Sequence, residues 1–309
     1  MGRLRDRVVA YLFAGQGSQY IGMGKDLCEA FPESKAVFDK ADKVLGFSIS
    51  KLCFEGPKQE LTRTVNCQPA ILTISIAAWE AYKAARGAGF STDGYVAGLS
   101  LGEYSALVAA EVMSFEDAVY LVRRRGEFMD EEALKSPGKM LSIIGLELSL
   151  VRQVCLDANT EIANINCPGQ VVIAGGAKEI EKAQELAKER GAKMAVMLEV
   201  SGAFHSSLMK GAAIRLAAEL EKIKLSAPVM PVVCNVTAKA ATSAAEIKDN
   251  LIKQVASSVL WEDSMKFLLS QGIINFIEFG PGKVLKGLMR RIEANAQVVS
   301  IEKKTDYAF

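Results

Sequence analysis

The sequence predicts an α/β fold built on a mainly parallel sheet, with a smaller unit inserted into a larger one. Short apolar runs recur between segments of helical length, and they lack the polar alternation of strands with one solvent-exposed face. Residues 139–198 instead predict the order strand, helix, strand, strand, helix, strand, which is that of a split ferredoxin-like unit. The length of 309 residues is sufficient for a large domain and a small one.

The larger unit begins with a predicted strand at residues 8–13, the uninterrupted apolar run VVAYLF before a Gly-rich turn. A helix is predicted from Pro69, which suits a first helical turn, to Arg86, before a stop at Gly87. Further strands are predicted at residues 95–97, 229–236, 273–279 and 298–301. This alternation indicates a parallel sheet with helices on both faces.

The smaller unit has its own pattern of expected elements. Its strands are predicted at residues 140–145, 161–165, 170–174 and 193–198, and its helices at residues 147–157 and 178–190. We therefore expect a small domain of residues 133–198, inserted into a large domain of residues 1–132 and 199–309.

The charges are balanced, with 37 Lys and Arg against 36 Asp and Glu, so nothing sequence-wide attracts nucleic acid or an anionic membrane. Six scattered cysteines form no C-x-x-C pair, which excludes a zinc or disulfide framework and indicates reduced thiols. The apolar run at residues 8–14 is too short for a signal peptide or a membrane span. We expect a cytoplasmic protein without a bound metal or cofactor, and without a nucleic-acid or membrane partner.

A candidate nucleophile is Ser100, because residues 98–102 read GLSLG and match the G-x-S-x-G pattern of a nucleophile elbow. The context agrees with a strand-turn-helix, since an apolar strand precedes the motif and apolar residues follow it at helical spacing. The alternative is a Gly-Ser turn without chemistry.

The only histidine, His205, is the candidate base that a serine hydroxyl requires near neutral pH. It follows an apolar strand and precedes a predicted amphipathic helix, and such loops carry the sites of open α/β sheets. The alternative is a surface histidine or one that caps a helix.

A helix is predicted from Phe115 to Met129, with Ser114 as its cap. Arg125 falls at the centre of the apolar stripe of this helix. A guanidinium aimed into a core requires an anion, and its planar shape suits a carboxylate. That carboxylate belongs either to an internal Asp or Glu, or to the substrate.

A Gly-rich loop at residues 15–17 does not continue as a dinucleotide fingerprint, because Tyr20 occupies the third glycine position. Residues 280–283 likewise lack the spacing of a phosphate-binding loop. The first loop can instead present the backbone N–H of Gln16 to a reacting carbonyl. With the N–H of Leu101, directly after the serine, it predicts a two-donor oxyanion hole.

Together these motifs resemble malonyl-CoA:acyl carrier protein transacylases over almost the whole chain. The resemblance rests on residues 13–19 (FAGQGSQ), 98–107 (GLSLGEYSAL), 125–126 (RG), 166–175 (NCPGQVVIAG), 204–206 (FHS) and 278–282 (EFGPG). It implies an α/β-hydrolase-like large domain and a ferredoxin-like small one. It also implies a nucleophile, a base, a carboxylate clamp and two oxyanion-hole amides at Ser100, His205, Arg125, Gln16 and Leu101, respectively.

Three further positions take roles from the resemblance. The main-chain carbonyl of Gln254 is expected to orient the histidine in place of the acid of a triad. Phe204 resembles the aromatic residue of malonyl-selective enzymes, whose bulk crowds an α-methyl branch, and Asn166 is expected to bind substrate. Leu99 departs from the family pattern, in which histidine often precedes the nucleophile, and this puts packing or rate near Ser100 in doubt.

The implied reaction is ping-pong transfer of malonyl from a coenzyme A thioester to a carrier-protein thiol, for fatty-acid or polyketide extension. A serine esterase or thioesterase with an acidic triad member, or a non-catalytic carrier-binding homologue, is the alternative. A monomer is expected.

Because such carriers are acidic, basic docking groups are expected, with ordinary solvated faces as the alternative. The two candidate groups are Lys286, Arg290 and Arg291, and Lys188, Arg190 and Lys193.

Overall fold

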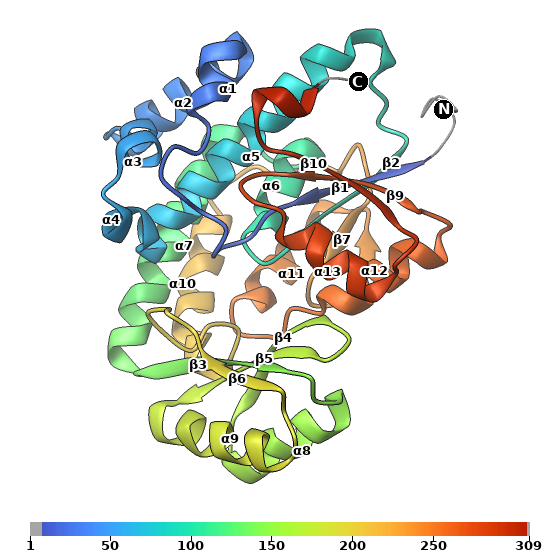
Figure 1. Ribbon diagram of the computed structural model, residues 1–309. Helices are drawn as coiled ribbons and strands as arrows, with labels where there is room; N and C mark the ends of the chain where they lie inside the picture. The colour runs from blue at the N-terminus through green and yellow to red at the C-terminus, as the bar shows by residue number, and fades with distance from the viewer. Residues whose placement is uncertain (1–7, 308–309) are drawn as a thin grey trace.

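Two separate sheets organise residues 8–307, the part of the chain that this computed structural model describes (Figure 1). The larger sheet has the strand order β10-β9-β1-β2-β7-β8. All its neighbouring pairs are parallel except β7 and β8. Its strands are β1 (Val9–Phe13), β2 (Gly94–Gly98), β7 (Val232–Cys234), β8 (Lys239–Ala241), β9 (Asn275–Phe279) and β10 (Gln297–Ile301). The predicted mainly parallel sheet is confirmed.

Both faces of the central strand β1 are buried, as its uninterrupted apolar sequence predicts. Tyr11 and Phe13 belong to one apolar cluster, whereas Ala10 and Leu12 belong to a second cluster on the other face. Because β1 and β2 are parallel and pair Phe13 with Gly98, the loops that follow them leave the sheet at the same edge. Open α/β sheets place their sites at this edge.

The predicted strand at residues 229–236 is longer than the observed strand β7. Pro231 precedes β7 and has no N–H with which to extend the ladder, although its carbonyl accepts a bond of 3.0 Å from Val96 N. The strand predicted from residue 273 likewise begins later, at Asn275.

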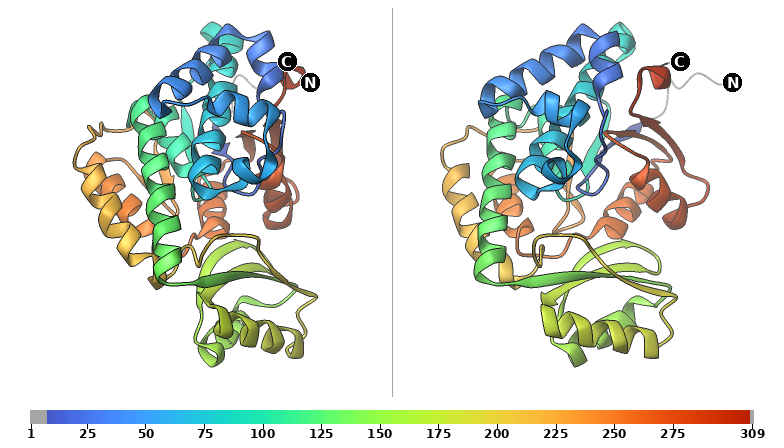
Figure 2. Two further views of the ribbon diagram at one scale, coloured as in Figure 1. Left: turned by 90° about the vertical axis from the view of Figure 1, so that its left-hand side faces the viewer. Right: turned by 60° about the vertical axis from the view of Figure 1, so that its left-hand side comes forward.

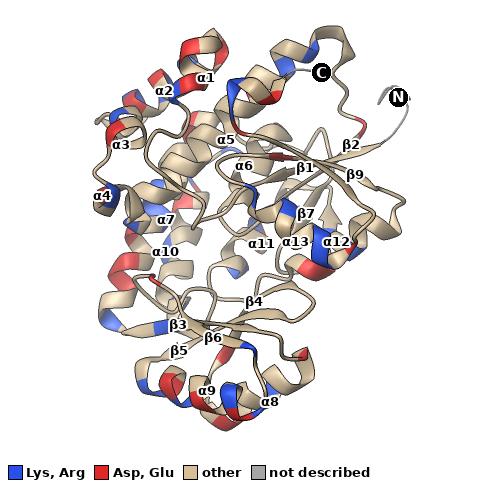
Figure 3. Ribbon diagram, in the orientation of Figure 1, with Lys and Arg blue, Asp and Glu red and all other residues tan. Residues whose placement is uncertain are grey.

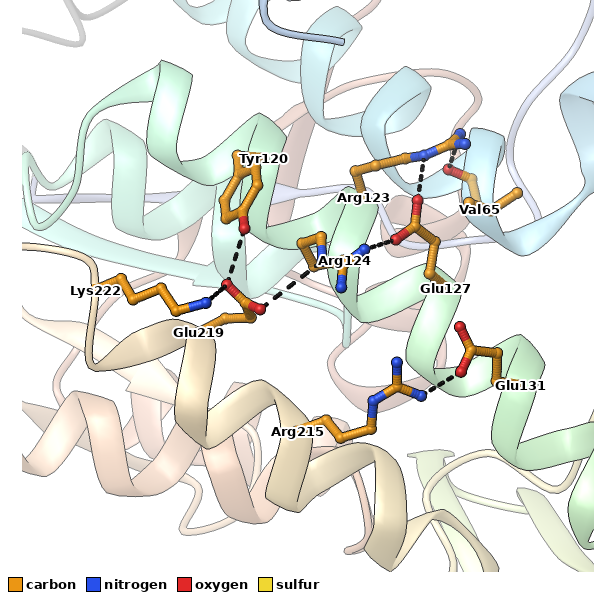
Figure 4. A network of polar contacts seen from close by, with 9 residues as sticks. All are labelled: Val65, Tyr120, Arg123, Arg124, Glu127, Glu131, Arg215, Glu219 and Lys222. Carbon is orange, nitrogen blue, oxygen red and sulfur yellow. Dashed lines mark hydrogen bonds and ion pairs between the residues drawn. The ribbon is translucent and has the colours of Figure 1, made fainter.

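Helix α5 (Thr64–Arg86) begins before the predicted start at Pro69, which therefore lies inside the helix. Proline has no N–H for the carbonyl of Val65, four residues earlier. That carbonyl accepts a hydrogen bond of 3.2 Å from Arg123 Nη1 instead (Figure 4). A neighbouring helix thus satisfies the group that proline leaves free, and the prediction of a start at Pro69 was wrong.

Arg123 belongs to α7 (Phe115–Lys135), which is capped by Ser114 as predicted and extends beyond the predicted end at Met129. Charged side chains join α7 to α10 (Lys210–Leu220), as Figure 4 shows. Glu219 accepts a hydrogen bond of 2.9 Å from Tyr120 Oη, and Arg215 pairs with Glu131. These contacts fix α7 against α10.

The other helices of the larger part lie around its mainly parallel sheet (Figure 2). They are α1 (Lys25–Ala30), α2 (Pro32–Leu45), α3 (Ile49–Glu55), α4 (Lys58–Thr62), α6 (Gly102–Ala109), α11 (Ala244–Gln254), α12 (Trp261–Ser270) and α13 (Val284–Ile292).

The second sheet is antiparallel and has the strand order β4-β5-β3-β6. Its elements follow the predicted succession: β3 (Gly138–Ile144), α8 (Leu148–Ala158), β4 (Glu161–Cys167), β5 (Gln170–Gly176), α9 (Ala177–Glu189) and β6 (Met194–Met197). The two helices lie on the face turned away from the rest of the molecule (Figures 1 and 2). A pair of backbone bonds, Ile165 N to Val259 O at 2.9 Å and Val259 N to Ala163 O at 2.8 Å, joins β4 to the larger part.

Residues 8–307 contain no helix long and apolar enough to cross a membrane. Within the same range, no cluster of three or more His, Cys, Asp or Glu side chains could hold a metal ion. All six cysteines are free.

A buried carboxylate fixes the end of the parallel sheet. Glu278 on β9 accepts hydrogen bonds from the N–H groups of Leu285 (2.8 Å) and Lys286 (3.2 Å) at the start of α13. It also accepts one from the Ser300 hydroxyl on β10, at 2.7 Å. One side chain thus joins two strands to a helix.

Glu278→Ala leaves these buried donors without an acceptor, and we expect it to lower the free energy of unfolding by about 2–3 kcal/mol. Urea denaturation measures this difference. Glu185→Ala, which removes an exposed carboxylate from α9, is the control and is expected to change stability by less than about 0.5 kcal/mol. Equal effects of the two substitutions would contradict the assigned role of Glu278.

Candidate active site

Ser100 lies on a tight turn between β2 and α6, with a backbone φ of 50°. The glycines around it have a steric reason. A Cβ on Gly98 would lie 2.0 Å from the carbonyl carbon of Gly102, and one on Gly102 would lie 2.1 Å from the carbonyl oxygen of Phe13. The G-x-S-x-G pattern therefore lets the helix start directly against the sheet, with the serine at the outside of the turn.

The lone histidine contacts this serine. Ser100 Oγ and His205 Nε2 are 2.7 Å apart, and His205 Nδ1 lies 2.8 Å from the main-chain carbonyl oxygen of Gln254. Since a carbonyl only accepts, Nδ1 carries the proton and Nε2 presents its lone pair to the serine hydroxyl. The geometry is that of a base oriented by an uncharged group.

His205 is only 5% exposed, and its pKa is lowered from 6.5 to about 4. Burial is the largest cause and the positive charge of Arg125 the second, whereas the Gln254 carbonyl opposes the shift. The imidazole is therefore neutral near pH 7, as a proton acceptor must be.

Arg125 projects from α7 into the site and is 1% exposed. Its Nη1 donates to Gln68 Oε1 at 2.8 Å, and its Nη2 donates to Ser100 Oγ and Gln254 Oε1, each at 3.2 Å. Among residues 8–307 no carboxylate lies within 4.0 Å of it, and its Nε has no partner. The internal ion pair weighed as an alternative is thus not formed by the described residues, and burial lowers the pKa of Arg125.

A cavity of about 320 Å³ brings most of the predicted site residues together. Gln16, Asn166 and Phe204 line it, together with Ser100, Arg125 and His205. The buried Oδ1 of Asn166 has no hydrogen-bond partner in the described chain. The small antiparallel sheet forms one wall, since β3 supplies Met140 and β5 supplies Val172.

The two predicted oxyanion amides lie at the edge of the sheet where the parallel strands end. Gln16 follows β1 and lines the cavity, and Leu101 directly follows Ser100 at the start of α6. Within the described residues, neither backbone N–H has a hydrogen-bond acceptor. Gln16 borders the cavity, whereas Leu101 is buried and is not among its lining residues.

Three buried polar residues of the site were not singled out from the sequence: Gln68, Glu103 and Asn235. Asn235 Oδ1 accepts from Ser100 N at 2.6 Å, and Glu103 Oε2 accepts from Asn235 N at 2.9 Å. Burial raises the pKa of Glu103 to about 7, and hydrogen bonds together with Arg125 oppose this rise. Glu103 carried a signal, since it is a charged residue among apolar helix positions. Gln68 and Asn235 carried none.

One member of each predicted basic group lies near the turn between β4 and β5. Arg291 on α13 donates to Gln170 Oε1 (2.9 Å) and to the carbonyl of Pro168 (3.0 Å). Lys193 packs on Gly145, whose N–H donates to Gly169 O at 2.8 Å. Arg190, in contrast, pairs with Asp157. Figure 3 shows the basic residues on α13 and on the small unit.

Comparisons with known proteins agree on one relationship. The family model of the acyl transferase domain matches residues 10–299. The malonyl CoA-acyl carrier protein transacylase of Bacillus subtilis (strain 168) is 49% identical over 298 residues, which cover 95% of this chain and 93% of that protein. That of Salmonella typhimurium is 44% identical over 287 residues, covering 92% of each chain.

Solved structures give the same result. The acyl carrier protein S-malonyltransferase of Vibrio cholerae superimposes with a TM-score of 0.93 at 41% identity, covering 96% of this chain and 98% of that one. A malonyl-transacylase solved in complex with its type II PKS acyl-carrier protein superimposes with a TM-score of 0.93 at 39% identity, covering 97% of both chains. The resemblance found in the sequence motifs is confirmed, and the chain belongs to the malonyl CoA-acyl carrier protein transacylase family.

Proposed function

We propose that this chain transfers a malonyl group from malonyl-CoA to the phosphopantetheine thiol of an acyl carrier protein through a malonyl-Ser100 intermediate. One observation carries the choice of acyl group. The buried Arg125 guanidinium lies 3.2 Å from Ser100 Oγ and has only neutral partners in the described chain. A carboxylate on the acyl group would complete this site.

In the first half-reaction, His205 takes the Ser100 proton while Oγ forms a bond to the thioester carbonyl carbon. The N–H groups of Gln16 and Leu101 stabilise the resulting oxyanion. The carbon–sulfur bond then breaks, and the coenzyme A thiolate leaves with the proton from His205. In the second half-reaction the carrier thiol gives its proton to His205 and attacks the acyl-serine, which releases Ser100 with its proton restored.

The orientation of His205 by the Gln254 carbonyl favours transfer over the esterase alternative. A serine esterase of α/β-hydrolase type orients its histidine with a carboxylate, whereas here Nδ1 contacts the neutral main-chain carbonyl of Gln254. Hydrolysis of the acyl-enzyme faster than transfer to a thiol would favour an esterase. Failure of Ser100 to become acylated would favour a non-catalytic homologue.

Two cavity residues refine the proposed specificity. Phe204 precedes His205 and lines the cavity, where its ring would crowd an α-methyl branch and so favour malonyl over methylmalonyl. Asn166 is proposed to contact the substrate, and its buried, unpartnered Oδ1 supports this role.

At the level of domains, we propose an α/β-hydrolase-like large domain of residues 1–132 and 199–309 and a ferredoxin-like small domain of residues 133–198. The antiparallel order β4-β5-β3-β6 supports the second assignment. The first boundary falls in the last turn of α7, and residues 1–7 and 308–309 lie outside the described part.

The carrier protein is proposed to dock on Lys193 and Arg291, with the other members of the two basic groups, Lys286, Arg290, Lys188 and Arg190, as further contacts. This site lies beside the turn that joins β4 to β5, next to the small-domain wall of the cavity.

The protein is proposed to act in the cytoplasm as a monomer, without a bound cofactor, in fatty-acid or polyketide synthesis. Its six free thiols are consistent with that compartment.

Ser100→Ala removes the proposed nucleophile and is expected to abolish covalent labelling by malonyl-CoA. Intact-mass measurement detects a malonyl adduct on the native chain and none on the variant. Ser105→Ala, which removes a buried hydroxyl from the helix that follows Ser100, is the control and should still be labelled. An adduct of equal yield on Ser100→Ala would show that another residue carries the acyl group.

Arg125→Ala removes the proposed carboxylate clamp and is expected to lower kcat/KM for malonyl-CoA by about 10³-fold. Acetyl-CoA gains nothing from the guanidinium, so its transfer should fall far less. Arg124→Ala is the matched control, because Arg124 neighbours Arg125 but pairs with Glu127 outside the cavity. Equal losses with both donors would refute the clamp.

The buried environment of His205 sets the acid limit of activity. Because its pKa is about 4, Nε2 stays unprotonated at about pH 5.5, where an ordinary histidine would be mostly charged. We expect kcat/KM to decline only as the pH falls through about 4, and the ring signal of this single histidine to titrate there by NMR. Arg125→Gln should raise this pKa by removing a positive charge. A pKa near 6.5 for His205 in the native chain would contradict the proposed effect of its buried environment.

A further inference from the structure

Below the turn that carries Ser100 lies a carboxylate to which the proposed reaction gives no part. Glu103 is three residues after Ser100, in the first turn of α6, and is 0% exposed. No Lys, Arg or His side chain lies within 4.0 Å of it among residues 8–307. A buried carboxylate without an ion pair is costly, so its hydrogen bonds must compensate.

Those hydrogen bonds converge on one oxygen. Glu103 Oε2 accepts from the backbone N–H of Asn235 and from Nε2 of Gln254, each at 2.9 Å. The other oxygen, Oε1, has no partner in the described chain. The carboxylate thus joins the end of β7 to the end of α11.

Asn235 transmits this contact to the backbone on both sides of the turn. Its Oδ1 accepts from Ser100 N at 2.6 Å, and its Nδ2 donates to Gly98 O at 2.8 Å. Ser100 has a φ of 50°, which is unfavourable for a residue with a side chain. Asn235 therefore holds the serine in a conformation that the turn alone does not favour.

Gln254 transmits the contact to the other groups of the site. Its Nε2 donates to Ser100 O at 3.1 Å, its Oε1 accepts from Arg125 Nη2 at 3.2 Å, and its main-chain oxygen accepts from His205 Nδ1 at 2.8 Å. Because Glu103 Oε2 accepts from Gln254 Nε2, the NH₂ end of the amide faces Glu103. The oxygen end must then face Arg125.

We propose that Glu103 is a positioning residue that fixes Ser100, His205 and Arg125 relative to one another through Asn235 and Gln254. It does not touch the substrate, and the inference rests on the proposed acyl-Ser100 reaction. Without the carboxylate, the Gln254 amide is free to rotate and to present NH₂ to the guanidinium. The reacting groups would then lose the alignment on which an intramolecular proton transfer and attack depend.

The test is the single-turnover rate constant for malonylation of Ser100 by malonyl-CoA, followed by quenched-flow mass spectrometry. Glu103→Met retains the volume but removes the acceptor, and it is expected to lower this rate constant by about 10²-fold. Glu103→Gln retains an acceptor oxygen and is expected to stay within about 10-fold of the native chain. Loss of folded protein would reduce the amplitude of labelling, not the rate constant.

Glu278→Ala is the matched control, because it also removes a buried carboxylate that accepts backbone N–H groups, at a place outside the site. It should lower stability and leave the rate constant unchanged. If Glu103→Met does not fold, Gln254→Ala removes the amide that donates to Glu103 and is expected to slow malonylation. The inference would be overturned if Glu103→Met or Gln254→Ala had the rate constant of the native chain. It would also be overturned if Glu103→Met and Glu103→Gln lost equal amounts of it. Absence of labelling on the native chain would instead overturn the proposed function.

Discussion

The close approach of α6 to the parallel sheet is the constraint on which the site depends. Gly102 lies against the carbonyl of Phe13, and Gly98 lies against Gly102, so neither position has room for a side chain. The chain can therefore turn from strand to helix within three residues, which drives Ser100 to a positive φ at the carboxyl edge of the sheet. The same turn leaves the backbone N–H of Leu101 without an acceptor in the described chain and buries Glu103 beneath it. The close approach thus sets the positions of the Ser100 hydroxyl, of this N–H and of the carboxylate below.

Neutral partners surround the charged groups of the cavity, and this has a clear electrostatic consequence. Arg125 is held by amide oxygens and a hydroxyl, and His205 is oriented by a main-chain carbonyl. A carboxylate beside either group would neutralise the guanidinium or raise the pKa of the imidazole. Among residues 8–307 no carboxylate contacts either group, because the Gln254 amide lies between Arg125 and Glu103. The guanidinium therefore remains able to bind an anionic acyl group. Burial of His205 is the larger cause of its lowered pKa, and the charge of Arg125 adds to it.

The small antiparallel unit contributes to the site as a wall, while Ser100, His205 and Arg125 come from the larger part. Met140 and Val172 of its sheet line the cavity, and Asn166 at the end of β4 adds a buried Oδ1 that has no hydrogen-bond partner in the described chain. Backbone bonds between β4 and Val259, five residues after Gln254, join this wall to the segment that orients His205. Arg291 adds a second link through Pro168 and Gln170. The position of the wall relative to the serine is thus fixed by bonds close to the site.

The sequence by itself determined the alternation of strands and helices, the serine turn, the single base and the guanidinium on the wrong face of its helix. Each of these depends on local periodicity or on a short motif, and local patterns remain visible in one dimension. Only the tertiary structure decided that Pro69 lies inside α5. The Arg123 guanidinium that donates to the Val65 carbonyl belongs to α7, which is distant in the sequence. The tertiary structure alone decided that Glu103, Asn235 and Gln254 form one network, since their contacts span more than 130 positions for Asn235 and more than 150 for Gln254. Hydrogen bonds between segments so far apart leave no periodic trace in the sequence.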